Sequence, residues 1–351
     1  MDNLKKILEN KLLRTLLVAI IAIIIVIIII LFLVSNVAST INENNLTEAA
    51  KKYYAKYNNY LPKENYNTVT VNLNTLISEG YLKRDMKGAE CPSYVSVTNM
   101  NGNYEYTPSI MCGENQNETL VSKISSSIVA SGDGLYNVNG KYIFRGENPN
   151  NYIQFAGELW RIIGLDEFNN IKIIKIKSEH NLWDDRYNSE YDEKFGINDF
   201  EVSRLKDYLD NYFEKNNKIY GAKQISKITK HSVCIGKASL ENGSYNICDN
   251  VLDNQLLSII TIDDYINSSL DASCSYENSI NCQNYNYLNL SGWTITADEN
   301  ESYMVYYIDS DEGINKGRAY VLKAIRPVIT LNNNIIYLSG NGTKENPYLI
   351  R

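Results

Sequence analysis

The sequence lacks the residues and motifs on which most enzymes and nucleic-acid-binding proteins depend. Only two of its 351 residues are histidines, His180 and His231, and neither lies in a recognisable catalytic motif. The chain contains no G-x-S-x-G, H-E-x-x-H or Walker-type loop and no Cys-x-x-Cys spacing of the kind that binds zinc. Its formal net charge of -7 argues against a nucleic-acid partner. We therefore expect a protein that is not an enzyme.

Charged and polar side chains are absent from residues 16–34, which read LLVAIIAIIIVIIIILFLV. A helix of this length rises about 28 Å, close to the thickness of the hydrocarbon core of a bilayer. Residues 35–42 carry no charge, whereas four basic residues precede the run: Lys5, Lys6, Lys11 and Arg14. This asymmetry predicts a transmembrane helix over 16–34, a cytoplasmic tail over 1–15 and an extracellular remainder. A cleaved signal peptide is the alternative, but its apolar region is normally shorter.

Six cysteines all follow the predicted span, where an oxidising environment favours disulfides. Residues 94–98 and 104–107 flank Asn101-Gly102, the favoured pair for a two-residue hairpin turn. Centring the hairpin on this pair places Cys91 opposite Cys112, and we predict a disulfide between them. Pairing of nearest neighbours predicts two more, Cys234–Cys248 and Cys274–Cys282.

The extracellular part is expected to form two domains of α+β class. The first, over residues 35–115, contains a helix from Leu46 to about Asn58, capped by Asn44 or Asn45. A polar linker follows over 116–133. The second domain, over 134–351, is mostly antiparallel, because its strands are separated by short turns that leave no room for crossover helices. The expected turns are Asn139-Gly140, Ala156-Gly157 and Asn169-Asn170. One longer helix is expected to be capped by Asn198 or Asp199, and its apolar face carries Val202, Leu205, Leu209 and Tyr212 or Phe213.

Two resemblances bear on these domains. The apolar anchor, the Tyr-rich helix AAKKYYAKYNNYLP and the small disulfide-closed strand region resemble type IV pilins and pseudopilins over about residues 1–115. The chain departs from that family before the apolar run, where KLLRT stands in place of a GFTLIE-like motif. The distal segments YIFRGENPNNYIQFAGELWRIIGLD, SGWTIT and IRPVITL resemble an uncharacterised surface domain of low-GC bacteria, distantly similar to the C-type-lectin-like and formylglycine-generating-enzyme-like fold. Both resemblances imply an exported protein.

Several residues are candidates for binding. Trp160, Trp183 and Trp293 are a possible sugar-stacking surface, although large aromatic side chains more often fill a core. Asp184-Asp185 is a possible carboxylate pair. Residues 309–313, DSDEG, resemble part of a calcium loop but do not match the EF-hand template, so a Ca²⁺ site is only a secondary expectation. No other cofactor is expected.

The leading hypothesis from the sequence is a single-pass, membrane-anchored extracellular protein whose distal domain serves adhesion or ligand binding. Its partners are then the bilayer, through residues 16–34, and a surface glycan or protein. Two alternatives remain open: a surface enzyme hosted on the distal domain, and a minor pseudopilin of a pilus or secretion-type assembly.

Overall fold

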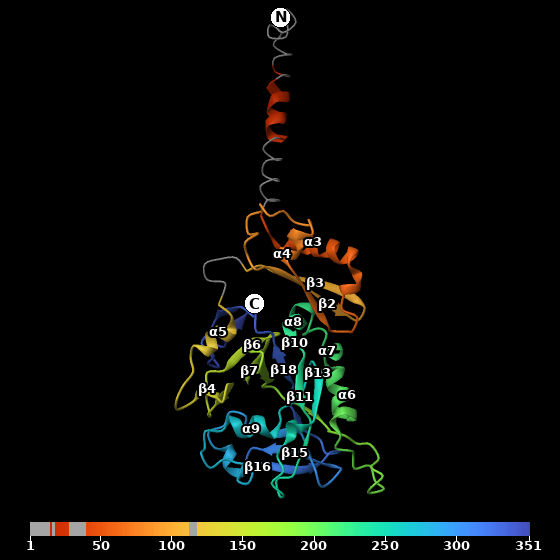
Figure 1. The fold of residues 1–351 in the computed structure, drawn as a ribbon, viewed down its shortest axis with the longest axis vertical. Helices are drawn as coiled ribbons and strands as arrows, with labels where there is room; N and C mark the ends of the chain where they lie inside the picture. Colours follow the sequence, from red (N-terminus) through yellow and green to blue (C-terminus); the bar gives the residue numbers. More distant parts are fainter. Residues whose placement is uncertain (1–14, 16–17, 28–39, 112–117) are drawn as a thin grey trace, which may run out of the picture. The chain divides into compact units, whose positions relative to one another are not determined.

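The computed structural model describes residue 15 and residues 18–27, 40–111 and 118–351. The chain divides into two compact units, Met1–Cys112 and Gly113–Arg351, here called the proximal and distal units (Figure 1). Residues 18–27 are helical. Among the described residues, no helix combines the length and apolar character needed to cross a membrane. Much of the predicted span, residues 16–17 and 28–34, lies outside the described residues.

The proximal unit packs one helix on a small antiparallel sheet. Helix α3 (Glu43–Lys56) begins at Asn42, whose side chain and that of Asn45 each accept a hydrogen bond from the other's backbone N–H at 3.0 Å. This capping box corrects the prediction of a cap at Asn44 or Asn45. The helix buries its apolar stripe against the sheet and the short helix α4 (Leu73–Ser78). The stripe consists of Leu46, Ala49, Ala50 and Tyr54.

The hairpin predicted around Asn101-Gly102 is confirmed. Strands β2 (Tyr94–Met100) and β3 (Asn103–Ser109) pair in the expected register, and β1 (Thr68–Asn72) adds to the other side of β2. Asn101 and Gly102 both adopt left-handed φ angles, +56° and +89°, which a two-residue turn of this twist requires. Cys112 lies outside the described residues, so its pairing with Cys91 stays a prediction.

The distal unit is a mixed α+β structure dominated by antiparallel pairs, as expected. Its largest sheet has the strand order β10-β18-β8-β7-β5-β4, with β6 (Tyr152–Phe155) also paired to β7. The bounds are β4 Gly134–Val138, β5 Lys141–Arg145, β7 Glu158–Leu165, β8 Ile171–Lys175, β10 Ile228–Thr229 and β18 Val328–Leu331. Left-handed residues occupy the predicted turns at Asn139-Gly140, Ala156-Gly157 and Asn169.

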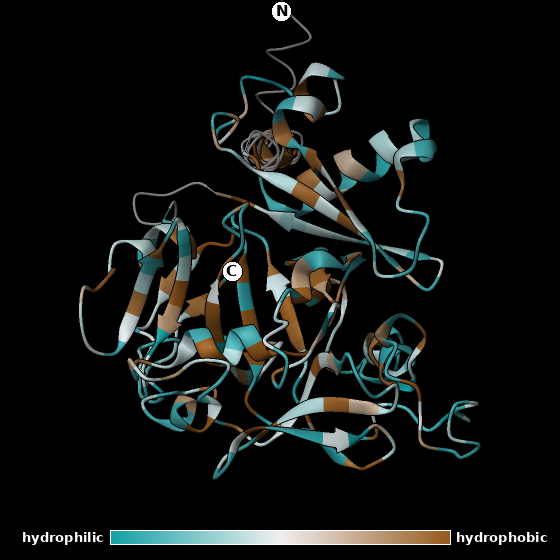
Figure 2. Ribbon diagram, turned by 60° about the horizontal axis from the view of Figure 1, so that its bottom comes forward, coloured by the Kyte–Doolittle hydropathy of each residue, from teal (hydrophilic) through white to brown (hydrophobic). Residues whose placement is uncertain are grey.

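A second sheet of four strands completes the distal core. It has the order β12-β14-β15-β16, in which only the pairing of β12 with β14 is parallel. Helix α9 (Ile262–Ser268) contacts strands of both sheets and so joins them (Figure 1). Apolar residues concentrate on the strands, while the connecting loops are largely hydrophilic (Figure 2). The bounds are β12 Lys237–Ala238, β14 Gly292–Asp298, β15 Met304–Asp309 and β16 Gly313–Arg318.

The distal unit also contains three two-stranded sheets. Strand β9 pairs with β17, β11 with β13, and β19 with β20, all antiparallel. The bounds are β9 Glu179–Asn181, β11 His231–Cys234, β13 Val251–Gln255, β17 Lys323–Ile325, β19 Tyr337–Ser339 and β20 Leu349–Ile350.

The predicted linker over 116–133 is wrong for the residues from 118 onward. Helix α5 (Leu120–Ser125) buries Leu120 and Ile124 completely, and the Leu120 N–H donates to the Ile335 carbonyl at 2.8 Å. Two apolar residues four positions apart on a helix share one face, and here that face covers the distal core. The distal unit therefore begins well before residue 134.

The single helix predicted after residue 198 is broken into three pieces. Asp199 caps only a 3-10 turn, η2 (Phe200–Val202), and Ser203 then caps a new helix, α6 (Arg204–Asp210), by accepting from the Lys206 N–H at 3.0 Å. A third piece, α7 (Tyr212–Lys215), follows. Leu205 and Leu209 are buried as predicted, whereas Val202 is exposed because the break at Ser203 rotates it away from the core.

Candidate functional site

The three tryptophans do not form a binding surface. Trp160 and Trp183 are 0% exposed and Trp293 is 2% exposed. Trp183 Nε1 donates to the Thr294 carbonyl at 3.1 Å, and Trp160 packs edge-on against Phe155. All three fill the distal core, which corrects the prediction of a sugar-stacking platform and agrees with the general tendency of large aromatic side chains.

Both predicted distal disulfides are present. Cys234–Cys248 closes the loop between β11 and β13, and Cys274–Cys282 closes a loop between α9 and the short 3-10 helix η4 (Ser279–Gln283). Structural disulfides persist where the surroundings are oxidising, so the distal unit belongs to such a compartment.

The acidic pair Asp184-Asp185 is divided between two structural roles. Asp184 is fully buried, and its carboxylate accepts from Arg186 Nε at 2.9 Å and from the backbone N–H of Ile197 at 2.7 Å. Asp185 is exposed and forms an ion pair with Arg204. The two carboxylates therefore do not act as a pair on one ligand.

Residues 309–313 form the turn between β15 and β16. The Asp309 carboxylate accepts from the Asp311 N–H at 2.9 Å, which closes the turn locally. A Cβ on Gly313 would lie 2.6 Å from the Ser279 carbonyl, so the turn packs closely on η4. In the described part of the chain, no group of three or more His, Cys, Asp or Glu residues is arranged to hold a metal ion.

The two histidines differ in environment. His180 is exposed on β9, whereas the His231 ring is largely buried and its Nε2 lies 3.2 Å from Ser258 Oγ. Burial is the main cause that lowers the pKa of His231 to about 4, with a smaller contribution from Lys172. Ser258 is 2% exposed, so its hydroxyl offers a substrate no access in this arrangement.

A cluster of partly exposed aromatic rings is the most distinctive feature of the distal surface. We call it the aromatic surface, and it consists of Tyr191, Phe195, Tyr303 and Tyr320. The ring centroid of Tyr303 lies 4.6 Å from that of Tyr191 and 5.3 Å from that of Phe195, and Phe195 stacks on Tyr320 at 5.9 Å. The exposed Arg318 guanidinium lies over Phe195 at 5.3 Å and donates to the Tyr320 hydroxyl at 3.1 Å.

A tightly held loop presents two of these rings. The Asn188 N–H donates to the Glu193 carbonyl at 2.8 Å, and its side-chain amide donates to the Gly196 carbonyl at 3.0 Å. Gly196 has a φ of +81°, and a Cβ there would lie 2.4 Å from the Asp184 carbonyl. The loop therefore needs glycine at this position, and its closure fixes the positions of Tyr191 and Phe195.

An acidic pocket of about 520 Å³ is built on the same β14–β15 turn that carries Tyr303. Buried Asn198 holds this turn, because its amide nitrogen donates to the carbonyls of Asp298, Glu301 and Met304, each at 2.8 Å. Its amide oxygen accepts from Lys237 at 2.7 Å. Four acidic residues and one basic residue line the pocket, namely Asp199, Glu201, Asp249, Glu299 and Lys237, together with the amides Asn246 and Asn250.

The electrostatics of the aromatic surface suit binding near neutral pH. Hydrogen bonding to Tyr320 raises the pKa of Arg318, which therefore stays charged. Burial and the neighbouring Glu301 raise the pKa of Tyr303, so its hydroxyl stays protonated. The surface combines planar rings, which contact apolar faces, with a guanidinium and neighbouring carboxylates, which contact polar groups. This combination is typical of contact surfaces.

The aromatic surface has no local signature in the sequence. Its rings come from residues 191–195 and from residues more than 100 positions later. With 28 tyrosines in the chain, no local signal distinguishes these from tyrosines that are buried, such as Tyr212 and Tyr265.

Comparison with known proteins finds no family model, no curated protein and no solved structure that matches this chain. The resemblances to pilins and to the surface domain of low-GC bacteria therefore stay predictions.

Proposed function

We propose that this chain is a single-pass membrane protein whose distal unit lies outside the cell and serves adhesion or ligand binding. The anchor is the apolar run 16–34, with residues 1–15 in the cytoplasm. The two distal disulfides support the extracellular location, because they require oxidising surroundings.

The observation that carries the binding proposal is the aromatic surface. Three tyrosines, a phenylalanine and an arginine gather there, and Tyr191 is 36% exposed. Tyrosine and arginine are the residues that contribute most to binding free energy at protein interfaces, and tyrosine rings also stack on sugars. The loop is already closed, so binding costs little conformational entropy.

Replacing Tyr191 and Tyr303 together by alanine should weaken binding of the ligand by about thirtyfold, equivalent to ~2 kcal/mol. The full chain, in a detergent without a sugar head group, is first screened against arrays of glycans and extracellular-matrix proteins. Titration of the strongest hit then gives Kd for the wild type and for the double variant.

Phe168→Ala is the matched control, because Phe168 is an exposed aromatic residue on a different turn of the same unit. It should leave Kd unchanged. Equal Kd values for the wild type and the double variant, with both chains folded by thermal melting, would refute a role for the aromatic surface.

The proposed topology predicts that protease added to intact cells expressing the protein removes the chain beyond about residue 42. The reason is that no membrane shields the part that follows the predicted anchor. Immunoblotting with antibodies against the two ends of the chain measures the loss, and an intact cytoplasmic marker shows that the cells are sealed. Survival of the distal unit while other surface proteins are digested would contradict the topology.

A further inference from the structure

A second pocket in the distal unit lies beside the Cys274–Cys282 disulfide and shares no residue with the aromatic surface. It has a volume of about 660 Å³, and its lining side chains are polar apart from one aromatic ring, that of Tyr285. The other lining residues are Glu147, Asp271, Gln283, Asn284, Asn286 and Asn289.

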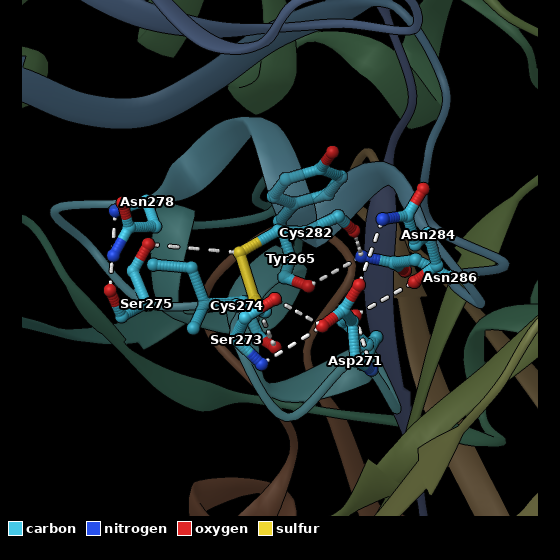
Figure 3. The surroundings of a disulfide bond; sticks show 12 residues. Tyr265, Asp271, Ser273, Cys274, Ser275, Asn278, Cys282, Asn284 and Asn286 are labelled. Carbon is cyan, nitrogen blue, oxygen red and sulfur yellow. Dashed lines mark hydrogen bonds between the residues drawn. A yellow bond between two sulfur atoms is a disulfide. The ribbon is translucent and has the colours of Figure 1, made fainter.

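Hydrogen bonds and the disulfide fix the wall of this pocket (Figure 3). The Asp271 carboxylate accepts from the Ser273 N–H at 2.9 Å and from the Asn284 side-chain amide at 2.8 Å. Two residues later, buried Asn286 donates through its amide nitrogen to the carbonyls of Tyr265 and Cys282, each at 2.8 Å. Both chain neighbours of Tyr285 are therefore held in place.

Tyr285 itself has an unfavourable backbone conformation. Its φ is +47°, in the left-handed region that bulky residues rarely adopt. Its side chain is 61% exposed, so burial of the ring does not compensate for this conformation. Residues in such conformations persist only where the surrounding structure holds them in place. They are found most often at active sites and ligand-binding positions. Here the residue in this conformation contributes an exposed aromatic ring to the lining of a polar pocket.

The charge of the pocket narrows the ligand class. Hydrogen bonds from Ser273 and Asn284 lower the pKa of Asp271, which is therefore a carboxylate at neutral pH. Glu147 is exposed and adds a second acidic group, and none of the residues that line this pocket is basic. An anionic ligand would meet like charge, whereas hydroxyl groups would find acceptors in the carboxylates and in the amides.

We propose that this pocket binds one pyranose ring of a neutral or amino sugar, with its C–H face stacked on Tyr285 and its hydroxyl groups donating to Glu147 and to the neighbouring amide oxygens. A sugar ring has one apolar face and a polar edge, which matches one exposed aromatic ring beside polar side chains. The disulfide and the two asparagines preorganise the wall, so little of the binding free energy is lost in ordering it.

The test is saturation-transfer NMR on the full chain, in a detergent without a sugar head group. The probes are the methyl glycosides of glucose, galactose, mannose and N-acetylglucosamine, together with glucosamine, and glucuronic acid as the anionic comparison. At least one neutral or amino sugar should receive saturation through its ring protons, and glucuronic acid should receive none. Tyr285→Phe should keep binding, and Tyr285→Gly should weaken it by tenfold or more.

Tyr285→Gly also separates a binding role from a structural one. Glycine adopts a φ of +47° without strain, so this variant should melt at a temperature equal to the wild type or about 2–4 °C higher while losing the sugar. Tyr285→Asn, which also tolerates this conformation, should behave in the same way. Phe168→Ala is the control and should bind normally.

Three results would overturn the proposal. They are the absence of saturation transfer to every neutral and amino sugar, equal binding by the wild type and Tyr285→Gly, and preferential binding of glucuronic acid. Because the aromatic surface is tested with its own variants, failure here leaves the proposed function standing, and failure there leaves this site standing.

Discussion

Replacing Lys175 by methionine is expected to lower the free energy of unfolding of the distal unit by about 3–5 kcal/mol. The side chain of Lys175 is almost fully buried, and its Nζ lies 3.1 Å from Glu158 Oε1 and 3.4 Å from Glu179 Oε1. Methionine keeps the apolar stem but leaves two neighbouring carboxylates without their shared cation. Their side chains are only partly exposed, 23% for Glu158 and 31% for Glu179, so water does not fully replace the lost cation.

Three tyrosines complete the hydrogen bonding of this cluster. Tyr212 accepts from Lys175 at 2.9 Å and donates to Glu179 at 2.9 Å, Tyr208 also donates to Glu179, and Tyr220 donates to Glu158 at 3.0 Å. Burial by itself would raise the pKa of the Glu179 carboxyl group. The hydrogen bonds from the tyrosines and the charge of Lys175 outweigh it and leave this pKa below its ordinary value. The network attaches helices α6 and α7 to the large sheet, so its loss should loosen that whole side of the unit.

Urea unfolding followed by tryptophan fluorescence measures this effect. All three tryptophans lie in the distal unit, so the signal from the full chain reports on that unit. Neutralising the two glutamates as well, in Lys175→Met/Glu158→Gln/Glu179→Gln, should recover part of the loss, because no unpaired charge remains. Asp185→Asn, which removes an exposed ion pair with Arg204, is the control and should cost less than about 1 kcal/mol. A loss for Lys175→Met no larger than for the control would contradict the network's role.

Acidification should also destabilise the distal unit, through His231. The pKa of His231 is about 4 in the folded protein, below the ordinary value of 6.5, because burial disfavours the charged ring. The unfolded chain therefore binds the proton first. The stability that the neutral ring contributes is fully present above about pH 6.5 and falls as the pH drops toward 4. Below about pH 4 this group causes no further loss of stability. Over this window the loss should be ~2–3 kcal/mol.

The measurement is the free energy of unfolding of the full chain at intervals between pH 7 and pH 4. The variant His231→Gln has no group that titrates at this position. Between pH 7 and pH 4 its free energy of unfolding should therefore fall by ~2–3 kcal/mol less than that of the wild type. His180→Gln, at the exposed histidine on β9, is the matched control and should keep the wild-type slope. Parallel curves for the wild type and His231→Gln would show that other groups cause the acid sensitivity.

The sequence by itself determined the features that depend on local dihedral angles and on short spacings. Asn101-Gly102 set both the turn and the register of its hairpin, because a two-residue turn with two left-handed residues allows one pairing. The same holds for the turns at Asn139-Gly140 and Ala156-Gly157. The distal disulfides followed from short separations of 14 and 8 residues. The mostly antiparallel α+β class followed from the short turns between strands.

Only the tertiary structure decided which side chains are covered and which remain at the surface. Trp160 and Tyr285 are both large aromatic residues, yet one is 0% and the other 61% exposed. The sequence around Leu120 and Ile124 reads as a polar linker, but these two residues pack on a core contributed by segments as far away as Ile335. Burial depends on what distant segments place over a residue, and no local pattern specifies that. For this reason the predicted tryptophan platform was wrong, and both proposed binding surfaces consist of residues that the sequence did not distinguish.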